Sequence, residues 1–473
     1  MEVEMPFRRK NEECPGRGEG VAATGLFAQG VGVSCRKHNA LGKARRMNVS
    51  QVALRLREQM QGFLRNLPVC KTARRFALEA LYGIQTRQSL KLSEIGRSLN
   101  ESIPLLKTED RLSRQASRAG LDEAVRDFVI EHGAARIGER TLLVLDPSDL
   151  TKPYAEKMEY LARVHDGSTG KITNGYWLCE IVGVDCGGQE IVPLVKHLWS
   201  QEAPEFRSEN AEILSCVNAV VRRVGRENGI WVMDRGGDRI RLYRAFLRLR
   251  VPFIVRLVGN RDLLWNGQNV LAEELAAACP LPYAETIWRE NADGTETALP
   301  LEFGYREVRL PGFEQRPLWM LVVRGFGEKP LMILTTLPLR KNRKVLWWVV
   351  EAYLTRWRIE DTLRFAKQSY DLEDVRVLGY QSLKNMMAMA LLAMFFSMVY
   401  LGQQTKLAVL CHHALTAARR LFGIPDFRYY AIADGIRAIL IGRITVPPFD
   451  FRRHEPQDDA QPDMLDMLGL AVT

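Results

Sequence analysis

The sequence is poor in cysteine and lacks long apolar runs. Its eight cysteines are spread over 473 residues, and no two of them form a Cys-x-x-Cys pair. This spacing excludes a disulfide-rich scaffold and gives no support to a zinc module. The run Cys411-His412-His413 does not change this, because adjacent residues of a helix point to different faces. Reduced thiols, and hence a cytoplasmic protein, are the simplest interpretation.

The chain also lacks a recognisable targeting or membrane segment. No apolar stretch follows the charged residues near the N-terminus, so we expect no signal peptide. The most apolar stretch, residues 386–401, is shorter than the roughly 20 residues that a membrane-spanning helix requires. We therefore predict a buried core helix there and no contact with a membrane.

The composition is that of a globular protein with a basic surplus. Apolar residues make up 47% and charged residues 26%, which excludes wholesale disorder. The 66 Lys and Arg residues exceed the 56 Asp and Glu residues, giving a net charge of +10. This balance favours a polyanionic partner.

The two ends of the chain differ from its middle. Residues 1–47 scatter Gly and Arg without a period and are predicted to be a disordered tail, with a basic arm that touches DNA as the alternative. Residues 451–473 are predicted to be a solvated acidic tail, because no Lys or Arg follows residue 453.

Residues 48–132 are predicted to be helical throughout. Apolar residues recur there at helical spacing. The short helix expected over residues 90–99, with a Ser near its start and a turn after Asn100, is typical of part of a helix-turn-helix. We interpret this region as a DNA-binding domain, and an ordinary pair of short helices is the alternative.

From residue 141 the apolar pattern changes to that of strands. The first strand ends at Asp146, a hairpin follows around Gly187-Gly188, and a later strand ends at Asp234. This order predicts a mixed α/β sheet. Residues 260–337 read as a mostly β insertion, and a long helix is expected from about residue 345 to 368. The expected core strands and helices span residues 141–145, 175–185, 190–198, 207–226, 229–233, 238–249 and 252–258.

One face of the long helix carries a distinctive set of polar residues. At roughly 100° per residue, five of them fall within an arc of about 80°. A solvated face with ion pairs one turn apart is one interpretation, and a site for a phosphodiester is the other. The five residues are Tyr353, Arg356, Glu360, Arg364 and Lys367.

Three carboxylates form the candidate catalytic set. Asp146 and Asp234 follow strands, and Glu360 lies on the long helix. Three carboxylates suit divalent metal ions, which prefer hard oxygen ligands. A pair of such ions can activate a water or a 3′-hydroxyl and stabilise the leaving oxygen. An aspartate after a strand is more often a helix cap or turn residue, so the argument depends on the three together.

These segments resemble the DDE transposases of bacterial insertion-sequence family four. Tyr353-x2-Arg356-x3-Glu360-x6-Lys367 matches that family's Y-R-E-K signature in residues and spacing. Residues 234–238, Asp-Arg-Gly-Gly-Asp, are similar to its second-aspartate segment. Residues 142–146 and 175–177 are similar to its first-aspartate segment. The resemblance covers roughly residues 50 to 440.

The resemblance implies a ribonuclease H-like mixed sheet core, α/β in class, with a mostly β insertion and helical N- and C-terminal regions. The core would comprise residues 133–259 and 338–404. Residues 405–450 would form a helical region that could pair two copies of the chain. Asp146, Asp234 and Glu360 would hold two Mg²⁺ ions, for which Mn²⁺ can substitute.

The implied activity is cut-and-paste transposition: cleavage at transposon ends and strand transfer into target DNA. The implied partners are double-stranded DNA, as terminal inverted repeats and as target, and a second copy of the chain. The implied location is the bacterial cytoplasm, at the nucleoid. The residues expected to contact DNA are Tyr353, Arg356, Arg364, Lys367, Arg235 and Lys171.

The sequence departs from the family at one point, and two other functions stay open. Where relatives carry a base-stacking Trp, this chain has Leu331 and Met332, so it offers no stacking ring there for a hairpin intermediate.

A decayed or domesticated DNA-binding relative that does not mobilise DNA is the first alternative function. A metal-dependent nuclease without a joining step is the second.

Overall fold

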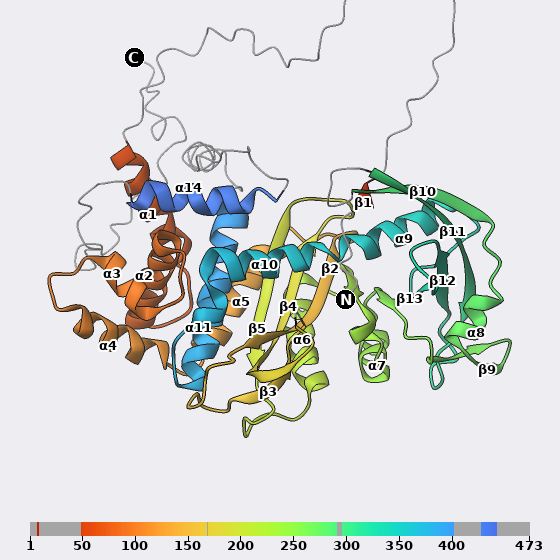
Figure 1. Cartoon of the computed structure of the whole chain (residues 1–473), viewed down its shortest axis with the longest axis horizontal. Helices are drawn as coiled ribbons and strands as arrows, with labels where there is room; N and C mark the ends of the chain where they lie inside the picture. The colour runs from red at the N-terminus through yellow and green to blue at the C-terminus, as the bar shows by residue number, and fades with distance from the viewer. Residues whose placement is uncertain (1–6, 9–48, 168, 291–295, 402–426, 442–473) are drawn as a thin grey trace, which may run out of the picture.

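The computed structural model describes residues 7–8, 49–167, 169–290, 296–401 and 427–441 (Figure 1). The predicted acidic tail, the run Cys411-His412-His413 and all but two residues of the predicted N-terminal tail lie outside these ranges. Of the predicted C-terminal helical region, residues 427–441 are described.

From Val49 to Ala134 the chain forms five helices, in agreement with the predicted helical region. A Cβ atom added at Gly83 of the second helix would lie 2.7 Å from the Ile95 side chain, so the second and third helices are in close contact there. Asn100 ends the third helix in the left-handed conformation, with φ of 48°. The helices are α1 (Val49–Phe63), α2 (Lys71–Arg87), α3 (Leu92–Leu99), α4 (Leu105–Ala116) and α5 (Leu121–Ala134).

The core is a mixed sheet with the strand order β5-β4-β2-β6-β7. The first three strands pair antiparallel, whereas β2, β6 and β7 run parallel. This arrangement is a ribonuclease H-like sheet, so the predicted fold class is confirmed. The strands are β2 (Leu142–Thr151), β4 (Ile172–Val184), β5 (Ile191–Trp199), β6 (Ile230–Met233) and β7 (Phe253–Arg256), with β3 (Ala162–His165) beside β4.

Helix α6 (Glu209–Val224) illustrates why these residues form these elements. Ser208 caps its first turn by accepting a hydrogen bond from the Ala211 amide at 3.2 Å. Acidic residues occupy the first turn and basic residues the last, which complements the helix dipole. The helix leads from β5 to β6, and α7 (Ile240–Leu249) then leads from β6 to β7.

Two helices cover opposite faces of the sheet. Successive strand residues point to opposite faces, so Lys196 and His197 of β5 separate the two sides. His197 bonds to Glu212 of α6, whereas Lys196 is electrostatically coupled to Lys367 of helix α10 (Arg358–Tyr370). Helix α6 therefore lies on one face and α10 on the other.

The predicted β insertion is present, and it extends the core sheet. Strand β13 pairs antiparallel with β7, and β12, β11 and β10 follow outward in order. The insertion forms the right-hand part of Figure 1, and β1 (Phe7–Arg8) pairs with its outer strand. Its elements are β8 (Asp262–Trp265), β9 (Gln268–Leu271), α8 (Ala272–Ala277), β10 (Tyr283–Glu290), β11 (Glu296–Val308), β12 (Leu318–Arg324) and β13 (Leu331–Thr335).

The prediction of a single long helix over residues 345–368 is wrong, because the chain forms two helices there. Helix α9 (Arg343–Thr355) ends before Arg356, and α10 begins at Arg358. The amides of Arg356 and Trp357 donate to carbonyls three residues back rather than four, which tightens the backbone and separates the two helices.

The predicted apolar core helix is confirmed as α11 (Tyr380–Phe395), which continues as a π-helical turn over Phe396–Tyr400. Residues Tyr380–Tyr400 are long and apolar enough to cross a membrane. However, 94% of the 18-residue apolar stretch within them is buried inside the protein. Helix α11 packs on α5, α2 and β5. A short turn, Leu372–Asp374, precedes it, and α14 (Tyr429–Ile441) lies across α1 and α2.

Candidate active site

Asp146 and Asp234 lie at the same level of adjacent strands. The last pair in the parallel register of β2 and β6 joins Val144 and Val232, and each aspartate lies two residues further along. The prediction that the first strand ends at Asp146 is wrong, because β2 continues to Thr151 through its pairing with β4. The two aspartates nevertheless meet where the parallel pairing stops.

The loop after β6 is held by its own aspartates. Asp234 caps the short helix Arg235–Gly237 and accepts a hydrogen bond from the Gly236 amide at 2.7 Å. Asp238 accepts bonds from Arg261 and from the Val258 amide, both at 2.7 Å. Asp238 therefore fixes the loop, and Asp234 remains half-buried beside β2.

The junction between α9 and α10 brings Glu360 to the same place. Helix α9 contacts β6 and β7, and α10 contacts β2 and β4, so their junction lies over the sheet between β6 and β2. Figure 1 shows the two helices following one another near β2. Glu360 lies in the first turn of α10. Its carboxylate forms an ion pair with Arg356 at 3.2 Å.

The charges of these residues act on one another. Burial, then the neighbouring Asp234 carboxylate, raises the pKa of Asp146 to about 7; Arg356 acts in the opposite direction and Glu360 adds to the rise. Burial alone would lower the pKa of Arg356, but Tyr353 and the three acidic residues raise it above its ordinary value. The guanidinium of Arg356 therefore lies among the three predicted carboxylates.

The three predicted carboxylates therefore lie near one another, but in this structure they are not arranged as the ligands of a metal ion. In the described ranges, no group of three or more His, Cys, Asp or Glu side chains has an arrangement that could hold a metal ion. The donor set still fits a divalent ion, since it consists of hard oxygen ligands. The cluster attracts a cation, as the position of Arg356 demonstrates.

The residues expected to contact DNA occupy different environments. Tyr353 and Arg356 are 4% and 7% exposed, so both are buried in this conformation. Arg235 and Lys171 are exposed. The Arg364 side chain is also exposed, near Asp361, and Lys367 forms an ion pair with Glu373 at 2.7 Å.

Sequence reasoning missed a buried ion pair beside Asp146. Glu180 of β4 and Lys196 of β5 pair across the sheet, and their residues are 2% and 5% exposed. Burial and the nearby Lys367 lower the pKa of Lys196, whereas the ion pair with Glu180 favours its charged form. The available signal was a single Glu in one mostly apolar strand and a single Lys in the other.

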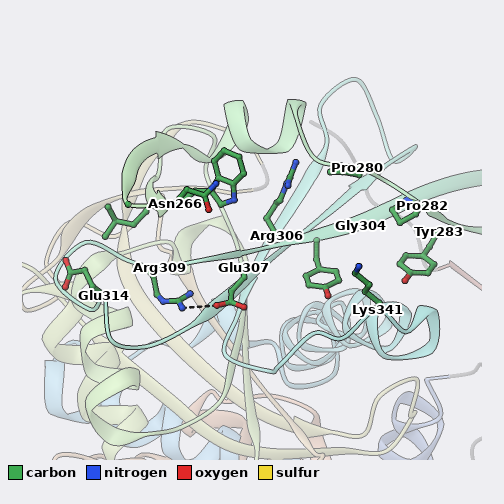
Figure 2. Close-up of a pocket in the computed structure, with 14 residues that line it drawn as sticks. Asn266, Pro280, Pro282, Tyr283, Gly304, Arg306, Glu307, Arg309, Glu314 and Lys341 are labelled. Atoms are coloured by element: carbon green, nitrogen blue, oxygen red, sulfur yellow. Dashed lines mark ion pairs between the residues drawn. The ribbon is translucent and has the colours of Figure 1, made fainter.

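A separate pocket of about 990 Å³ lies on the β insertion (Figure 2). Arg306 lies over the Trp265 ring at 5.1 Å, and Glu307 pairs with Arg309 at 2.8 Å. Tyr283 and Lys341 line the end opposite Glu314 in Figure 2. The pocket lies outside the carboxylate cluster, and its lining combines aromatic, cationic and acidic residues.

Comparison with known families identifies the class of protein to which the core is similar. Residues 208–396, less than half of the chain, match the family model described as a transposase DDE domain. The matched segment contains Asp234 and Glu360, and Asp146 precedes it. This part of the chain is therefore similar to transposases that carry DDE domains.

Individual proteins add little to this match. The piggyBac transposase, in a cryo-EM structure of its synaptic complex with hairpin DNA, is similar over 85% of this chain and 80% of its own. The TM-score is 0.40 and the sequence identity 10%. No curated protein matches the chain.

Proposed function

We propose that this protein is a DDE transposase that cleaves DNA at transposon ends and transfers the freed strand into target DNA. The main support is that Asp146, Asp234 and Glu360 lie near one another on a ribonuclease H-like sheet. The family match over residues 208–396 supports the same class. We extend the proposal to the bacterial insertion-sequence family four because of the Y-R-E-K signature, with the bacterial cytoplasm as its location.

Asp146, Asp234 and Glu360 are proposed to hold two Mg²⁺ ions, or Mn²⁺ in their place. When bound, such ions activate a water or a 3′-hydroxyl and stabilise the leaving oxygen. Arg356 pairs with Glu360 in this structure. It would be available to a DNA phosphate if the carboxylates held metal ions instead. The Glu360 side chain is 33% exposed, so this part of the cluster is accessible from solvent.

The remaining regions have proposed roles in DNA handling. Residues 48–132 form the proposed DNA-binding domain, and residues 405–450 the proposed contact between two copies of the chain. Arg364, Lys367, Arg235, Lys171 and Tyr353 are proposed to contact phosphates of the ends or of the target. Lys and Arg contacts of this kind release counterions and make binding salt-dependent.

Removing any one of the three carboxylates tests the proposal. Asp146→Ala, Asp234→Ala and Glu360→Ala should each lower the rate of cleavage of terminal inverted repeats by roughly a thousandfold or more, since each removes a ligand that the others cannot replace. The measurement is cleavage of labelled DNA ends with Mg²⁺, with binding followed in parallel by gel shift. Chelation of the metal should have the same effect on cleavage.

Binding of the ends should persist in all three variants. Glu328→Ala, which changes an exposed acid in the turn before β13, is the matched control and should cleave normally. Full cleavage by any of the three carboxylate variants would remove the assignment. Cleavage without end specificity and without joined products would favour the simple nuclease.

A further inference from the structure

A row of charged residues crosses the sheet at the level of Asp146. Asp146 of β2 lies opposite Glu180 of β4, and Glu180 lies opposite Lys196 of β5. Directly opposed residues of neighbouring strands point to the same face, at a strand spacing of about 4.8 Å. Asp234 continues the row on the other side of Asp146.

Along this row, one positive charge at the β5 end is followed by three negative charges. Lys196 is at one end, Glu180 separates it from Asp146, and Asp234 follows. The ion pair joins the two residues at the β5 end of the row, because Lys196 contacts the Glu180 carboxylate. The two aspartates at the other end are left with Glu360 and Arg356.

Burying such a pair is not needed for folding. The desolvation of two buried charges offsets much of their attraction, and two apolar residues of similar size commonly serve as well. In this row, however, Glu180 lies between Lys196 and Asp146. Without Lys196, Glu180 would be a fourth carboxylate in the cluster; without Glu180, the ammonium of Lys196 would have Asp146 as the next acid along the row.

We propose that Glu180 and Lys196 are a positioning pair that leaves Asp146 free for a metal ion. Lys196 neutralises Glu180, and Glu180 holds the ammonium one strand away from Asp146. Neither residue touches the reacting atoms. The proposal rests on the proposed function, because it assigns the pair a role in the metal site of that activity.

Four variants of the full chain test this order of charges. Glu180→Gln frees the ammonium, Lys196→Met frees the carboxylate, and the double variant removes both charges. The charge-swapped variant E180K/K196E keeps an ion pair in the same place but moves the ammonium beside Asp146. Affinity for Mn²⁺ is measured by calorimetry, and urea unfolding reports stability separately.

The two single variants should change metal affinity in opposite directions. Glu180→Gln should weaken Mn²⁺ binding on the order of tenfold, because a cation now competes for Asp146. Lys196→Met should bind Mn²⁺ at least as tightly as the unaltered protein. The double variant should return close to the original affinity, and the charge-swapped variant should bind as weakly as Glu180→Gln.

A purely structural pair would lower stability without this pattern. Equal Mn²⁺ affinities for the unaltered, charge-swapped and double variants would overturn the proposal. If a single variant does not fold, the comparison of the double and charge-swapped variants decides. Failure of the proposed function is distinct: the unaltered protein would then bind no Mn²⁺, or would bind it equally after Asp146→Ala.

Discussion

At the residue scale, the neighbours of each acidic side chain determine its role. Asp238 is occupied by Arg261 and a backbone amide, so it holds a loop. Burial, followed by repulsion from the carboxylates of Asp234 and Glu360, raises the pKa of Asp146. An acid that is destabilised by like charges is a candidate ligand for a cation.

His197 shows the opposite case, in which a neighbour supports the charged form. Burial opposes protonation, but Cys216 and the Glu212 carboxylate, 2.9 Å away, raise the pKa of His197 above 6.5. Because the folded value is raised, the stabilisation is complete below pH 6.5 and is lost as the pH rises through the folded value. The contribution of His197 to the free energy of unfolding in urea should therefore fall from about pH 6.5 upward.

The His197→Gln variant should show a flatter dependence of stability on pH over the same range. His165→Gln, which changes an exposed histidine, is the control and should behave as the unaltered protein does. A profile for His197→Gln that parallels the unaltered protein would contradict the pairing with Glu212.

The sequence predicts some site residues and not others for a physical reason. Asp234 and Glu360 are predictable, because one directly follows an apolar strand and the other lies within a spaced motif. Glu180 and Lys196 are recognisable only as charges within apolar strands. Their partnership depends on the register of β4 with β5, which no local pattern reveals.

At the element scale, the close approach of strands depends on small residues. Strand β4 passes between β2 and β3 at Gly175, which pairs with Thr151 and Ala162. A Cβ atom there would lie 2.5 Å from the Leu150 carbonyl oxygen and 2.7 Å from the Val164 side chain. The backbone contact cannot be relieved by a side-chain rotation.

Gly175→Ala should therefore lower the free energy of unfolding by roughly 1–3 kcal/mol. Urea unfolding measures the change. Gly138→Ala is the matched control, since no atom lies within 4 Å of a Cβ atom added at that position. Equal stabilities for the two variants would show that the strands separate freely at Gly175.

The sequence predicts which helices and strands form better than it predicts where each one ends or breaks. The apolar periods predict the core strands and α6, since these elements bury apolar residues at regular spacing. They do not predict the passage of β2 beyond Asp146 or the break at Arg356. The first depends on a long partner strand, and the second on local backbone bonds to carbonyls three residues back.

At the scale of the whole molecule, α11 joins the N-terminal helices to the core. Asn385 is fully buried, and its side-chain amide donates to the carbonyls of Ala116 and Arg118 at 2.6 and 2.7 Å. Its side-chain oxygen accepts a bond from the Asp122 amide at 2.9 Å. One side chain therefore satisfies three backbone groups between α4 and α5.

Asn385→Ala should lower the free energy of unfolding by roughly 2–4 kcal/mol, because it leaves those backbone groups without partners. Urea unfolding followed by circular dichroism measures the loss. Leu378→Ala, which changes a residue that is 69% exposed, is the control and should have little effect. An unchanged midpoint for Asn385→Ala would mean that other contacts hold the helices to the core.

The insertion returns to the core through β13, which lies directly beside β7. This position affects what would happen if a chain of this fold lost the insertion. Strand β7 has β6 on one side and β13 on the other. A shorter chain without the insertion would leave the backbone of β7 open along one edge, as a template on which foreign strands could add. Length variation at this point is therefore coupled to solubility, and a relative lacking the insertion would need its own device to protect that edge.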